Sequence, residues 1–518
     1  MRTRRKISAP LLAPLLLAPL LIALVLVGTS SLGSAAPSSP ARAAHPPTPT
    51  DLTIMEFNIE YGGTGVDFGK VVEAVQASGA SLVAIEEAEG NMGRLAQALG
   101  WSYCDPRRQL VSQYPLFGPP NNDSSYAYVA VGTGAIAIGN VHLPSWPYSP
   151  NLILKHGANL KEVLAAENKA RVPQMQKLVG KVSGAPDSPV QLGVPTFILG
   201  DFNSPSNLDY VPAMVGTRPQ IKYPVEWPVT KALQDAGFTD SYRAIHSDPT
   251  VDAGLTWPAA RPKIPGQWNP PADAPQDRID YIFSTGTATP TDSQTMGEIG
   301  GPGVWKSVDP WPSDHRALVS RFSVTPGTPP ALVAPNAEFV ATGSTLTVNY
   351  ISPTTPAAIV AVTRGTGRHE LPTPAGQESA GSVGFDTTGW AAGTYVITLA
   401  DGGGTTLATA SVWIQEPGSH PEIATTKTAY RPGEPIRVRW KNAPGNRWDW
   451  VGIYERGANP NVDWYLDWAY TGATVQGSLT FNEKSHGPWP LKPGKYSVYL
   501  LVDDSYNDVA EGRFTVLG

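Results

Sequence analysis

Residues 196–206 read TFILGDFNSPS, an apolar strand candidate that runs directly into an Asp-x-Asn pair. The run Thr196–Leu199 has the length and composition of a buried strand. In folds that alternate strands with helices, ligand sites gather where strands end. An isolated Asp-x-Asn pair usually forms only a turn, so Asp201 and Asn203 predict a site only if other strands end in the same way.

Other strand candidates of the same region also meet polar residues at one end. These residues are Asn58 after 52–57, Glu86 and Glu87 after 81–85, His142 after 134–141, Asp277 and Asp280 around Arg278, and Asp314 and His315 before 317–322. Each has an ordinary alternative, such as a solvated helix start or a histidine satisfied in the interior. Their joint occurrence at strand ends predicts one convergent site.

Helical spacing of apolar residues separates several of these strands. The helix candidates are 68–77, 92–99 and 161–179. Strands that alternate with helices are typical of an α/β domain. We therefore expect one such domain, with several long loops, over residues 51–323.

The order of the strand-end segments is similar to that of the endonuclease/exonuclease/phosphatase superfamily, which includes DNase I, abasic-site endonucleases, bacterial sphingomyelinases and inositol-polyphosphate 5-phosphatases. The segments are FNIEYGG, LVAIEEAEG, NVHLPS, GDFNSPS, DRIDYIF and SDHRALV. The resemblance covers about residues 51–323. It implies a DNase I-like α/β (α+β) four-layer sandwich, with two packed sheets between outer helices and the site at the common edge of the sheets.

This resemblance also implies a Mg²⁺ site, with Mn²⁺ or Ca²⁺ as alternatives. Glu87 matches the main metal ligand of the family, Asn58 would help hold the water shell of the metal, and Asp314 would support the metal or the water. Carboxylate and amide oxygens suit Mg²⁺. Glu86 stands where the family usually has glutamine, which adds an acidic group beside Glu87.

Five further residues would carry the catalytic chemistry: His142, Asp201, Asn203, Asp280 and His315. Asp201 and Asn203 would flank the scissile phosphate, and His142 would donate a hydrogen bond to one of its oxygens. His315 would act as a general base, or contact the phosphate, while a carboxylate orients its ring. The chain shows no Ser, Thr or Cys nucleophile motif, which favours direct attack by water.

Two questions about the site stay open in the sequence. The carboxylate that orients His315 is assigned to Asp280, but family members place it on either side of the arginine, so Asp277 is an alternative. Trp257 and Arg278 are the candidate substrate-binding residues. Aromatic residues near this edge could stack on bases or enter a lipid surface, or they could simply pack their own Pro-rich loops.

The composition of the sequence changes near Thr325, where several prolines predict a linker over 324–332. Short alternating strands separated by Gly and Pro then follow, as is typical of β-sandwiches. The tail also repeats weakly: residues 345–350 resemble 435–440, and 393–399 resemble 494–500. We expect two all-β sandwich (Ig-like) modules, at 333–416 and 417–518, with one larger β-domain as the alternative. Tail tryptophans such as Trp464 could contact carbohydrate or a cell surface, or could form a core.

The N-terminus is predicted to be a signal peptide and the start of a leader over 1–43, with a disordered leader at 44–50. A basic start precedes the apolar run Leu11–Val27, and small residues with A-x-A-like cleavage sites follow. The alternative is a membrane anchor, but two prolines interrupt the run. No other stretch reaches about 18 apolar residues, so we expect a secreted protein without a stable membrane span. Cys104 is the only cysteine, so no internal disulfide can form.

Composition and charge leave the substrate open. The formal net charge of −6 argues against a surface built wholly to grip nucleic acid, although a local basic rim would suffice for a nuclease. We expect a secreted, monomeric, Mg²⁺-dependent phosphoesterase that hydrolyses a phosphodiester as a nuclease does. A sphingomyelinase-like or phospholipase C-like enzyme, or a hydrolase of small organic phosphates, is the alternative. A non-catalytic secreted binding protein is the alternative of another class.

Overall fold

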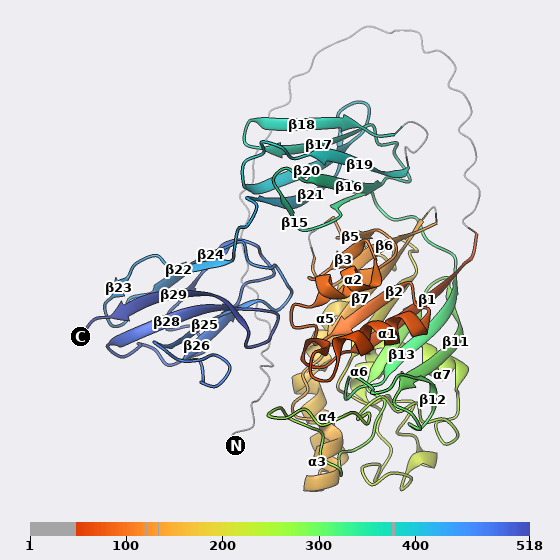
Figure 1. The fold of residues 1–518 in the computed structure, drawn as a ribbon. Coiled ribbons are helices and arrows are strands. Elements are labelled where there is room, and N and C mark those ends of the chain that lie inside the picture. The colour runs from red at the N-terminus through yellow and green to blue at the C-terminus, as the bar shows by residue number, and fades with distance from the viewer. Residues whose placement is uncertain (1–47, 121–122, 133, 375–378) are drawn as a thin grey trace, which may run out of the picture.

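The computed structural model describes residues 48–120, 123–132, 134–374 and 379–518. Residues 50–324 form two β-sheets with helices outside them, and two β-sandwiches follow (Figure 1). The predicted signal peptide and most of the leader fall within residues 1–47, outside the described residues. Thr50 pairs with Val324, so strand β1 begins inside the segment predicted as a disordered leader.

The first sheet has the strand order β12-β11-β13-β1-β2-β4-β3. Its strands are β1 (Thr50–Asn58), β2 (Leu82–Glu86), β3 (Tyr103–Asp105), β4 (Leu110–Ser112), β11 (Ala288–Gly297), β12 (Val304–Ser307) and β13 (Ala317–Val324). β1 runs parallel to β2 and antiparallel to β13.

The second sheet has the strand order β5-β6-β7-β8-β10-β9. Its strands are β5 (Leu116–Phe117), β6 (Ala127–Val131), β7 (Gly134–His142), β8 (Thr196–Asp201), β9 (Thr239–Asp240) and β10 (Asp280–Thr285). β8 is parallel to β7 and antiparallel to β10. Strands β7 and β8 therefore end at the edge where β10 begins.

Alternation along the strands separates three cores. In β1, Leu52 and Ile54 lie in the core between the two sheets. Met55 and Phe57 point the other way, into the core beneath α1 and α2. A third core lies between the second sheet and helices α5 and α6. This order of helices, sheet, sheet and helices confirms the predicted four-layer fold.

The helices are α1 (Phe68–Ser78), α2 (Met92–Leu99), α3 (Ser149–His156), α4 (Leu160–Ala170), α5 (Val172–Ser183), α6 (Pro228–Asp235) and α7 (Ser241–Ile245), with short 3₁₀ turns at Tyr61–Gly63 and Pro212–Met214. The single helix predicted over 161–179 is instead the pair α4 and α5. Pro173 stands in the first turn of α5, where its missing N–H is tolerated, whereas it would break the hydrogen-bond ladder of a continuous helix.

The C-terminal region forms two β-sandwiches with the same topology. The first has sheets β14-β16-β19 and β15-β21-β20-β17-β18, and the second has β22-β24-β27 and β23-β29-β28-β25-β26. Each strand of one has its counterpart eight strands later in the other. The weak repeat seen in the sequence thus corresponds to the central strands β16 and β24, and β20 and β28. Each sandwich has its own apolar core between its sheets.

The strands of the first sandwich are β14 (Leu332–Pro335), β15 (Phe339–Ala341), β16 (Thr345–Ile351), β17 (Ile359–Arg364), β18 (Gly367–Pro372), β19 (Ala380–Asp386), β20 (Gly393–Ala400) and β21 (Thr406–Gln415). Those of the second are β22 (Glu422–Thr425), β23 (Ala429–Tyr430), β24 (Ile436–Lys441), β25 (Trp450–Glu455), β26 (Asp467–Tyr470), β27 (Gly477–Phe481), β28 (Gly494–Leu501) and β29 (Asp508–Val516).

The segment predicted as a linker over 324–332 is hydrogen-bonded to the α/β domain at Thr325 and at Gly327. The backbone N–H of Thr325 donates to the carbonyl oxygen of Thr287 at 2.9 Å. Gly327 and Ala135 exchange backbone hydrogen bonds of 2.9 Å in both directions, and Leu332 already begins β14. In the part of the chain that the structure describes, we find no helix long and apolar enough to cross a membrane.

Candidate active site

At one end of both sheets, the side chains between the sheets change from apolar to polar. On β1 the inward positions run Leu52, Ile54, Glu56 and Asn58, and on β8 they run Phe197, Leu199 and Asp201. The corresponding polar positions elsewhere are Glu86 on β2, Asn140 and His142 on β7, and Asp280 on β10. The period of two that builds the core therefore also brings these polar groups to one edge.

The carboxylates of Asp201 and Asp280 and the imidazole of His315 form the centre of this edge. One ligand atom from each lies within 4.8 Å of the others, and all three side chains are buried. Asp201 and Asp280 face each other directly in the β8–β10 ladder. Gly200 permits the pairing of β8 with its other neighbour, β7, because a Cβ at that position would lie 1.9 Å from the carbonyl oxygen of Val141 on β7.

His315 is oriented by Asp280. Its Nδ1 lies 3.0 Å from Oδ1 and 3.1 Å from Oδ2 of Asp280, while its Nε2 lies 3.7 Å from Oδ2 of Asp201. Burial alone would lower the pKa of His315, but the carboxylates of Asp280 and Asp201 raise it well above its usual value. Ser313 fixes the segment, because its hydroxyl donates to the carbonyl of Asn58 and accepts from the backbone N–H of His315.

The structure resolves the choice between the two aspartates around Arg278. Asp280 contacts His315, whereas Asp277 accepts hydrogen bonds from the hydroxyls of Tyr148 (3.0 Å) and Tyr210 (2.8 Å). Asp277 is thus buried against these two tyrosines and not against His315. The geometry supports Asp280, and not Asp277, as the partner of the histidine.

Two asparagines hold Asp201 in place. Asn58 Nδ2 donates to Oδ2 of Asp201 at 3.2 Å, and Asn203 Nδ2 donates to the same oxygen at 3.0 Å. The backbone N–H of Asn203 donates to the other oxygen at 2.8 Å. Burial and then Asp280 raise the pKa of Asp201 to about 7, against the opposing effect of His315 and these hydrogen bonds. His142 completes this side, with its Nε2 at 3.5 Å from Oδ2 of Asp201.

Asp314 and Glu60 form a second carboxylate group next to the first. The backbone N–H of Asp314 donates to Glu60 at 3.0 Å, and Arg261 makes a bidentate ion pair with Glu60. Burial, followed by Asp314, raises the pKa of Glu60 to about 7, and Glu87 contributes in the same direction. Glu87 therefore lies near this second group, and it is outside the cluster of Asp201, Asp280 and His315.

A pair of buried glutamates lies beneath the site. Burial and nearby carboxylates raise the pKa of Glu56 well above its usual value, and burial raises that of Glu86 to about 8. Among the described residues, none of the four carboxyl oxygens of this pair has a hydrogen-bond partner, so burial disfavours the charged form of each group. Glu86, which replaces the usual glutamine, thus adds a second buried carboxyl group beside Glu56.

The predicted substrate contact of Arg278 is corrected by its placement. Its guanidinium is fully buried and makes four hydrogen bonds of 2.8–3.0 Å to Asp209 and Asp240. Its charge therefore holds the segment before β10 to Asp240 on β9 and to Asp209 in the loop after β8, and it has no access to a substrate. Arg278 is a structural residue of the domain.

Trp257 forms a wall beside His315. Its ring centroid lies 6.4 Å from that of the imidazole, and its Nε1 donates to Oδ2 of Asp314 at 3.1 Å. Trp268 stacks on Trp257 with an interplanar angle of 5° and is 44% exposed. Trp257 itself is largely covered, so Trp268 and the 59% exposed Trp146 present more aromatic surface to solvent.

Sequence reasoning missed Glu56, Glu60, Asn140 and Arg261. Glu56 and Asn140 could have been found by the alternation that picked out Asn58 and His142, because each stands two residues before one of them. Glu60 and Arg261 are 201 positions apart, and no local pattern in the chain links them.

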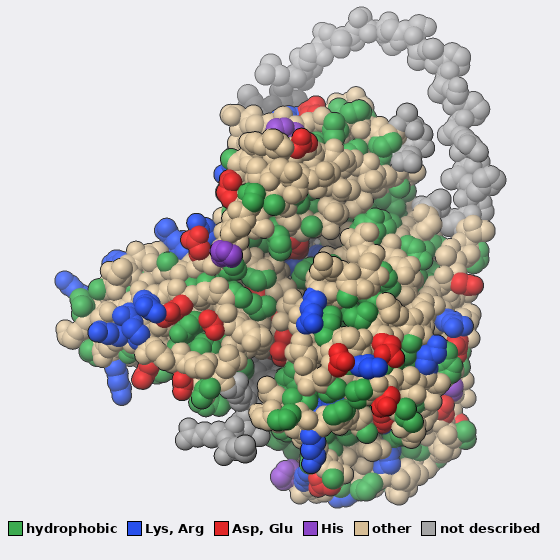
Figure 2. Space-filling model, in the orientation of Figure 1, with side chains coloured by type: hydrophobic (Ala, Val, Ile, Leu, Met, Phe, Trp, Pro, Cys, Tyr) green, Lys and Arg blue, Asp and Glu red, His purple; other side chains and the backbone are tan. Residues whose placement is uncertain are grey.

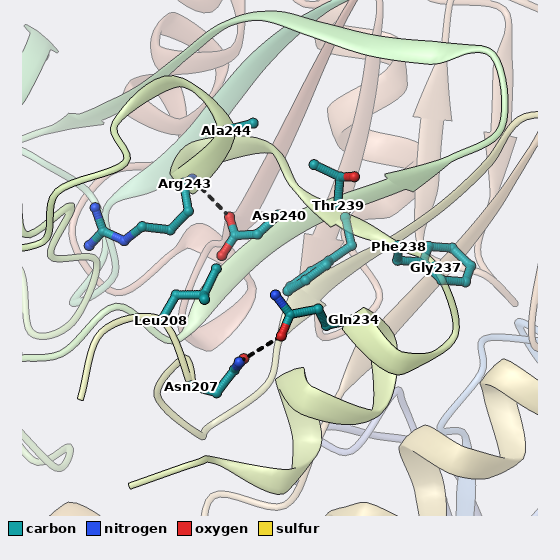
Figure 3. Close-up of a pocket in the computed structure, with 10 residues that line it drawn as sticks. Asn207, Leu208, Gln234, Gly237, Phe238, Thr239, Asp240, Arg243 and Ala244 are labelled. Carbon is teal, nitrogen blue, oxygen red and sulfur yellow. Dashed lines mark hydrogen bonds between the residues drawn. The ribbon is translucent and has the colours of Figure 1, made fainter. Parts of the chain in front are cut away.

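A pocket of about 400 Å³ lies elsewhere, beside α6, α7 and β9 (Figure 3). Asn207 donates to Gln234 across it, and Asp240 accepts from the backbone N–H of Arg243 (Figure 3). None of the predicted site residues lines this pocket. It is separate from the carboxylate–histidine edge.

Comparison with known proteins agrees with this geometry. Residues 55–315 match the family described as the Endonuclease/Exonuclease/phosphatase family. An uncharacterized protein of Caenorhabditis elegans is 28% identical over 298 residues, covering 53% of this chain and 92% of its own length.

Two solved structures are also similar to parts of the chain. An endonuclease/exonuclease/phosphatase from Beutenbergia cavernae is 15% identical, covers 70% of this chain and 99% of its own, and has a TM-score of 0.30. The human OSCAR ligand-binding domain is 15% identical, covers 36% of this chain and 96% of its own, and has a TM-score of 0.20. The assignment of a family rests on the sequence match over residues 55–315.

Proposed function

The chain belongs to the endonuclease/exonuclease/phosphatase family, and from this premise we propose that its catalytic domain hydrolyses a phosphodiester by metal-assisted attack of water. The observation that carries the proposal is the placement of His315, bound to Asp280 through Nδ1 and facing Asp201 with Nε2. A histidine held by a carboxylate can take up or release a proton near neutral pH. Here it stands at an edge rich in carboxylates, where a hydrolytic water can be oriented.

The carboxylates of this edge fit a divalent cation. Asp201 and Glu60 both have a pKa raised to about 7 because they are buried close to other carboxylates, so His315 and Arg261 offset only part of the negative charge of the site. We assign Mg²⁺ to the oxygens of Asn58, Glu87 and Asp314, with Mn²⁺ or Ca²⁺ as alternatives. When bound, the cation neutralises charge that develops on the phosphate oxygens.

Asp201, Asp280 and His315 could themselves form a metal site, and we propose instead that they move and hold protons. Mg²⁺ prefers oxygen ligands, and Nδ1 of His315 is already engaged by Asp280. Asp280 keeps Nε2 directed toward Asp201 and stabilises the imidazolium once a proton is bound.

The remaining residues position the phosphate and the water. Asp201 is fixed by the amides of Asn58 and Asn203, so its carboxylate can orient the attacking water. His142 retains partial solvent access at 3.5 Å from Asp201, from where its imidazole can donate to a phosphate oxygen. These roles need no covalent intermediate.

The test is a panel of phosphate esters with the purified full-length protein. Supercoiled plasmid, bis(p-nitrophenyl) phosphate, p-nitrophenyl phosphate and phospholipid vesicles would be assayed in Mg²⁺, with EDTA and with the His315→Ala variant as controls. We expect cleavage of a diester that both controls abolish. Turnover of the monoester alone would contradict the proposal, and loss of every activity would favour a non-catalytic binding protein.

A second candidate is a phospholipid diesterase, which the exposed tryptophans favour. Trp268 stacks on Trp257 beside His315, and Trp146 follows His142 by four residues. Both are exposed, and exposed tryptophans suit a membrane interface. On the face in view, Lys and Arg side chains are scattered among Asp and Glu rather than gathered in one basic patch (Figure 2). Release of phosphorylated headgroup from vesicles without plasmid nicking would select this candidate.

We also propose that the protein is secreted after cleavage of its N-terminal segment. The basic start, the apolar run Leu11–Val27 and the small residues after it support this. Intact-mass analysis of protein recovered from the culture medium would test it. A mass that includes residues 1–30, or retention of all protein in the membrane fraction, would contradict it.

A further inference from the structure

The second β-sandwich contacts the catalytic domain through two loops at one of its ends. One loop joins β24 to β25, and the other joins β28 to β29. We call residues 446–449 and 502–503 the tip. Oδ2 of Asp503 accepts a hydrogen bond from the backbone N–H of Gly90 at 3.1 Å. The backbone N–H of Arg447 donates to the carbonyl of Pro106, at 3.3 Å. The module lies beside the N-terminal part of the catalytic domain (Figure 1).

The segment that the tip contacts is the loop 87–91, which follows β2 and begins with Glu87. Glu87, Glu89 and Gly90 have φ angles of 54°, 45° and 85°. Left-handed backbone is uncommon at residues other than glycine, and it persists where the surrounding structure holds it in place. Inside the catalytic domain, the loop is held by the N–H of Gly62, which donates to the carbonyl of Glu87 at 2.8 Å.

The fit between the tip and the loop is close. A Cβ on Gly90 would lie 2.5 Å from Cγ1 of Val502, so only glycine permits this approach. Asp503 is buried, and its backbone N–H donates to Oδ1 of Asp449 at 3.1 Å. Asp449 also accepts two hydrogen bonds of 3.0 Å from Asn446. The acceptor that meets Gly90 is therefore held rigidly by its own module.

A second contact reaches the strand that ends in His142. Nη1 of Arg447 donates to the carbonyl of Asn140 at 2.9 Å. The side-chain amide of Asn140 in turn donates to the carbonyl of Ile85, at 3.2 Å, just before the two glutamates of β2. The tip thus touches two of the chain segments that lead to the carboxylate–histidine edge, the loop after β2 and the end of β7.

We propose that the second β-sandwich is a working part of the active site, in which Asp503 and Val502 hold the loop 87–91 in the conformation that presents Glu87 to the metal. Asp503 is a positioning residue, since it acts through Gly90 and not on the substrate. This inference rests on the proposed function, because it assigns Glu87 to the metal. According to this inference, the second β-sandwich supports catalysis and is more than a spacer.

The test uses Asp503→Ala in the full-length protein, without metal and then with Mn²⁺. Hydrogen exchange of the peptide spanning 86–92 should be faster than in the unsubstituted protein. The Kd for Mn²⁺, measured by calorimetry, should rise about tenfold, as is typical when a group that supports a metal ligand is removed. Excess metal should restore most of kcat, because the catalytic groups remain in place. Asp503→Asn keeps an acceptor for Gly90 and should recover both values.

The matched control is Asp467→Ala in the same module. Asp467 is also buried and accepts hydrogen bonds from two backbone N–H groups, of Trp468 and Gly487. Its loss should lower the Tm of the module without changing the exchange of 86–92 or the Kd for Mn²⁺. Arg447→Met offers a second variant should Asp503→Ala fail to fold, because it weakens the tip at its other contact.

Unchanged exchange and an unchanged Kd in folded Asp503→Ala would overturn the inference, as would equal effects of Asp467→Ala. Failure of the proposed function would appear differently. The unsubstituted protein would then show no metal-dependent hydrolysis of any ester in the panel, whatever the exchange of the loop.

Discussion

Asp280 and Asp201 stand directly opposite each other in the β8–β10 ladder, and Asp280 binds Nδ1 of His315 at 3.0 Å. The pairing of β8 with β10 therefore places Asp280, which orients His315, beside Asp201, which faces Nε2 of His315. Both are buried at the end of an otherwise apolar inter-sheet layer. Sheet register fixes the two aspartates, and His315, which lies just before β13, is held by Asp280 and Ser313. Substitutions here should therefore change turnover more than stability.

His315→Ala should lower kcat by at least about 10²-fold, because a positioned acid–base group contributes on the order of 10²–10⁴-fold. The Tm should change little, and both would be measured on the same preparation. His246→Ala is the matched control, since His246 also pairs with a carboxylate, Asp252, at 3.0 Å, but lies outside the site. Near-normal turnover in His315→Ala would show that another group moves the proton.

Asp280→Asn and Asp277→Asn should distinguish the carboxylate that orients His315 from the one that stabilises the fold. Asp280→Asn removes the charge that stabilises the imidazolium, so kcat should fall by about 10²-fold or more and the pH profile should shift. Asp277→Asn disturbs an acceptor of two tyrosine hydroxyls, so it should lower Tm and leave most of kcat. The reverse pattern would assign the orienting role to Asp277.

Arg278→Met should destabilise the domain by about 3–5 kcal/mol, because it leaves Asp209 and Asp240 as buried carboxylates without their shared cation. Denaturant unfolding would measure the loss. Arg513→Met, which removes an exposed pair with Glu511, should cost less than about 1 kcal/mol. Normal stability with a raised KM would instead restore the substrate role predicted from sequence.

Stability should depend on pH through Asp503. Burial raises the pKa of Asp503 from its ordinary value of 3.8 to about 6, while Gly90, Trp448 and Arg447 oppose the shift. The folded state then binds more protons than the unfolded state between these values. The free energy of unfolding should therefore fall as pH rises from about 4 to about 6, by about 3 kcal/mol in total.

Calorimetric scans across this pH range would measure that fall in the unsubstituted protein and in Asp503→Asn. The variant lacks the titrating group, so its stability should vary less with pH. An equal slope in both proteins would assign the pH dependence to other carboxyl groups.

The sequence predicted the positions of Asn58, Asp201 and His142 because strand alternation and strand ends are local features. It did not separate Asp277 from Asp280, since both flank Arg278 and only the start of β10 decides which faces His315. It also assigned Arg278 to substrate, because its partners Asp209 and Asp240 are 69 and 38 positions away. The contact between Gly90 and Asp503 spans 413 positions and depends on how separate modules dock, which no local pattern encodes.

The most direct test of the central claim is a Mn²⁺ titration followed by calorimetry and by diester turnover, in the unsubstituted protein, Glu87→Gln and His315→Ala. The account predicts that Glu87→Gln weakens Mn²⁺ binding at least about tenfold, and that His315→Ala binds Mn²⁺ with an unchanged Kd while losing turnover. Loss of Mn²⁺ binding in His315→Ala, with normal binding in Glu87→Gln, would contradict it and place the metal on Asp201, Asp280 and His315.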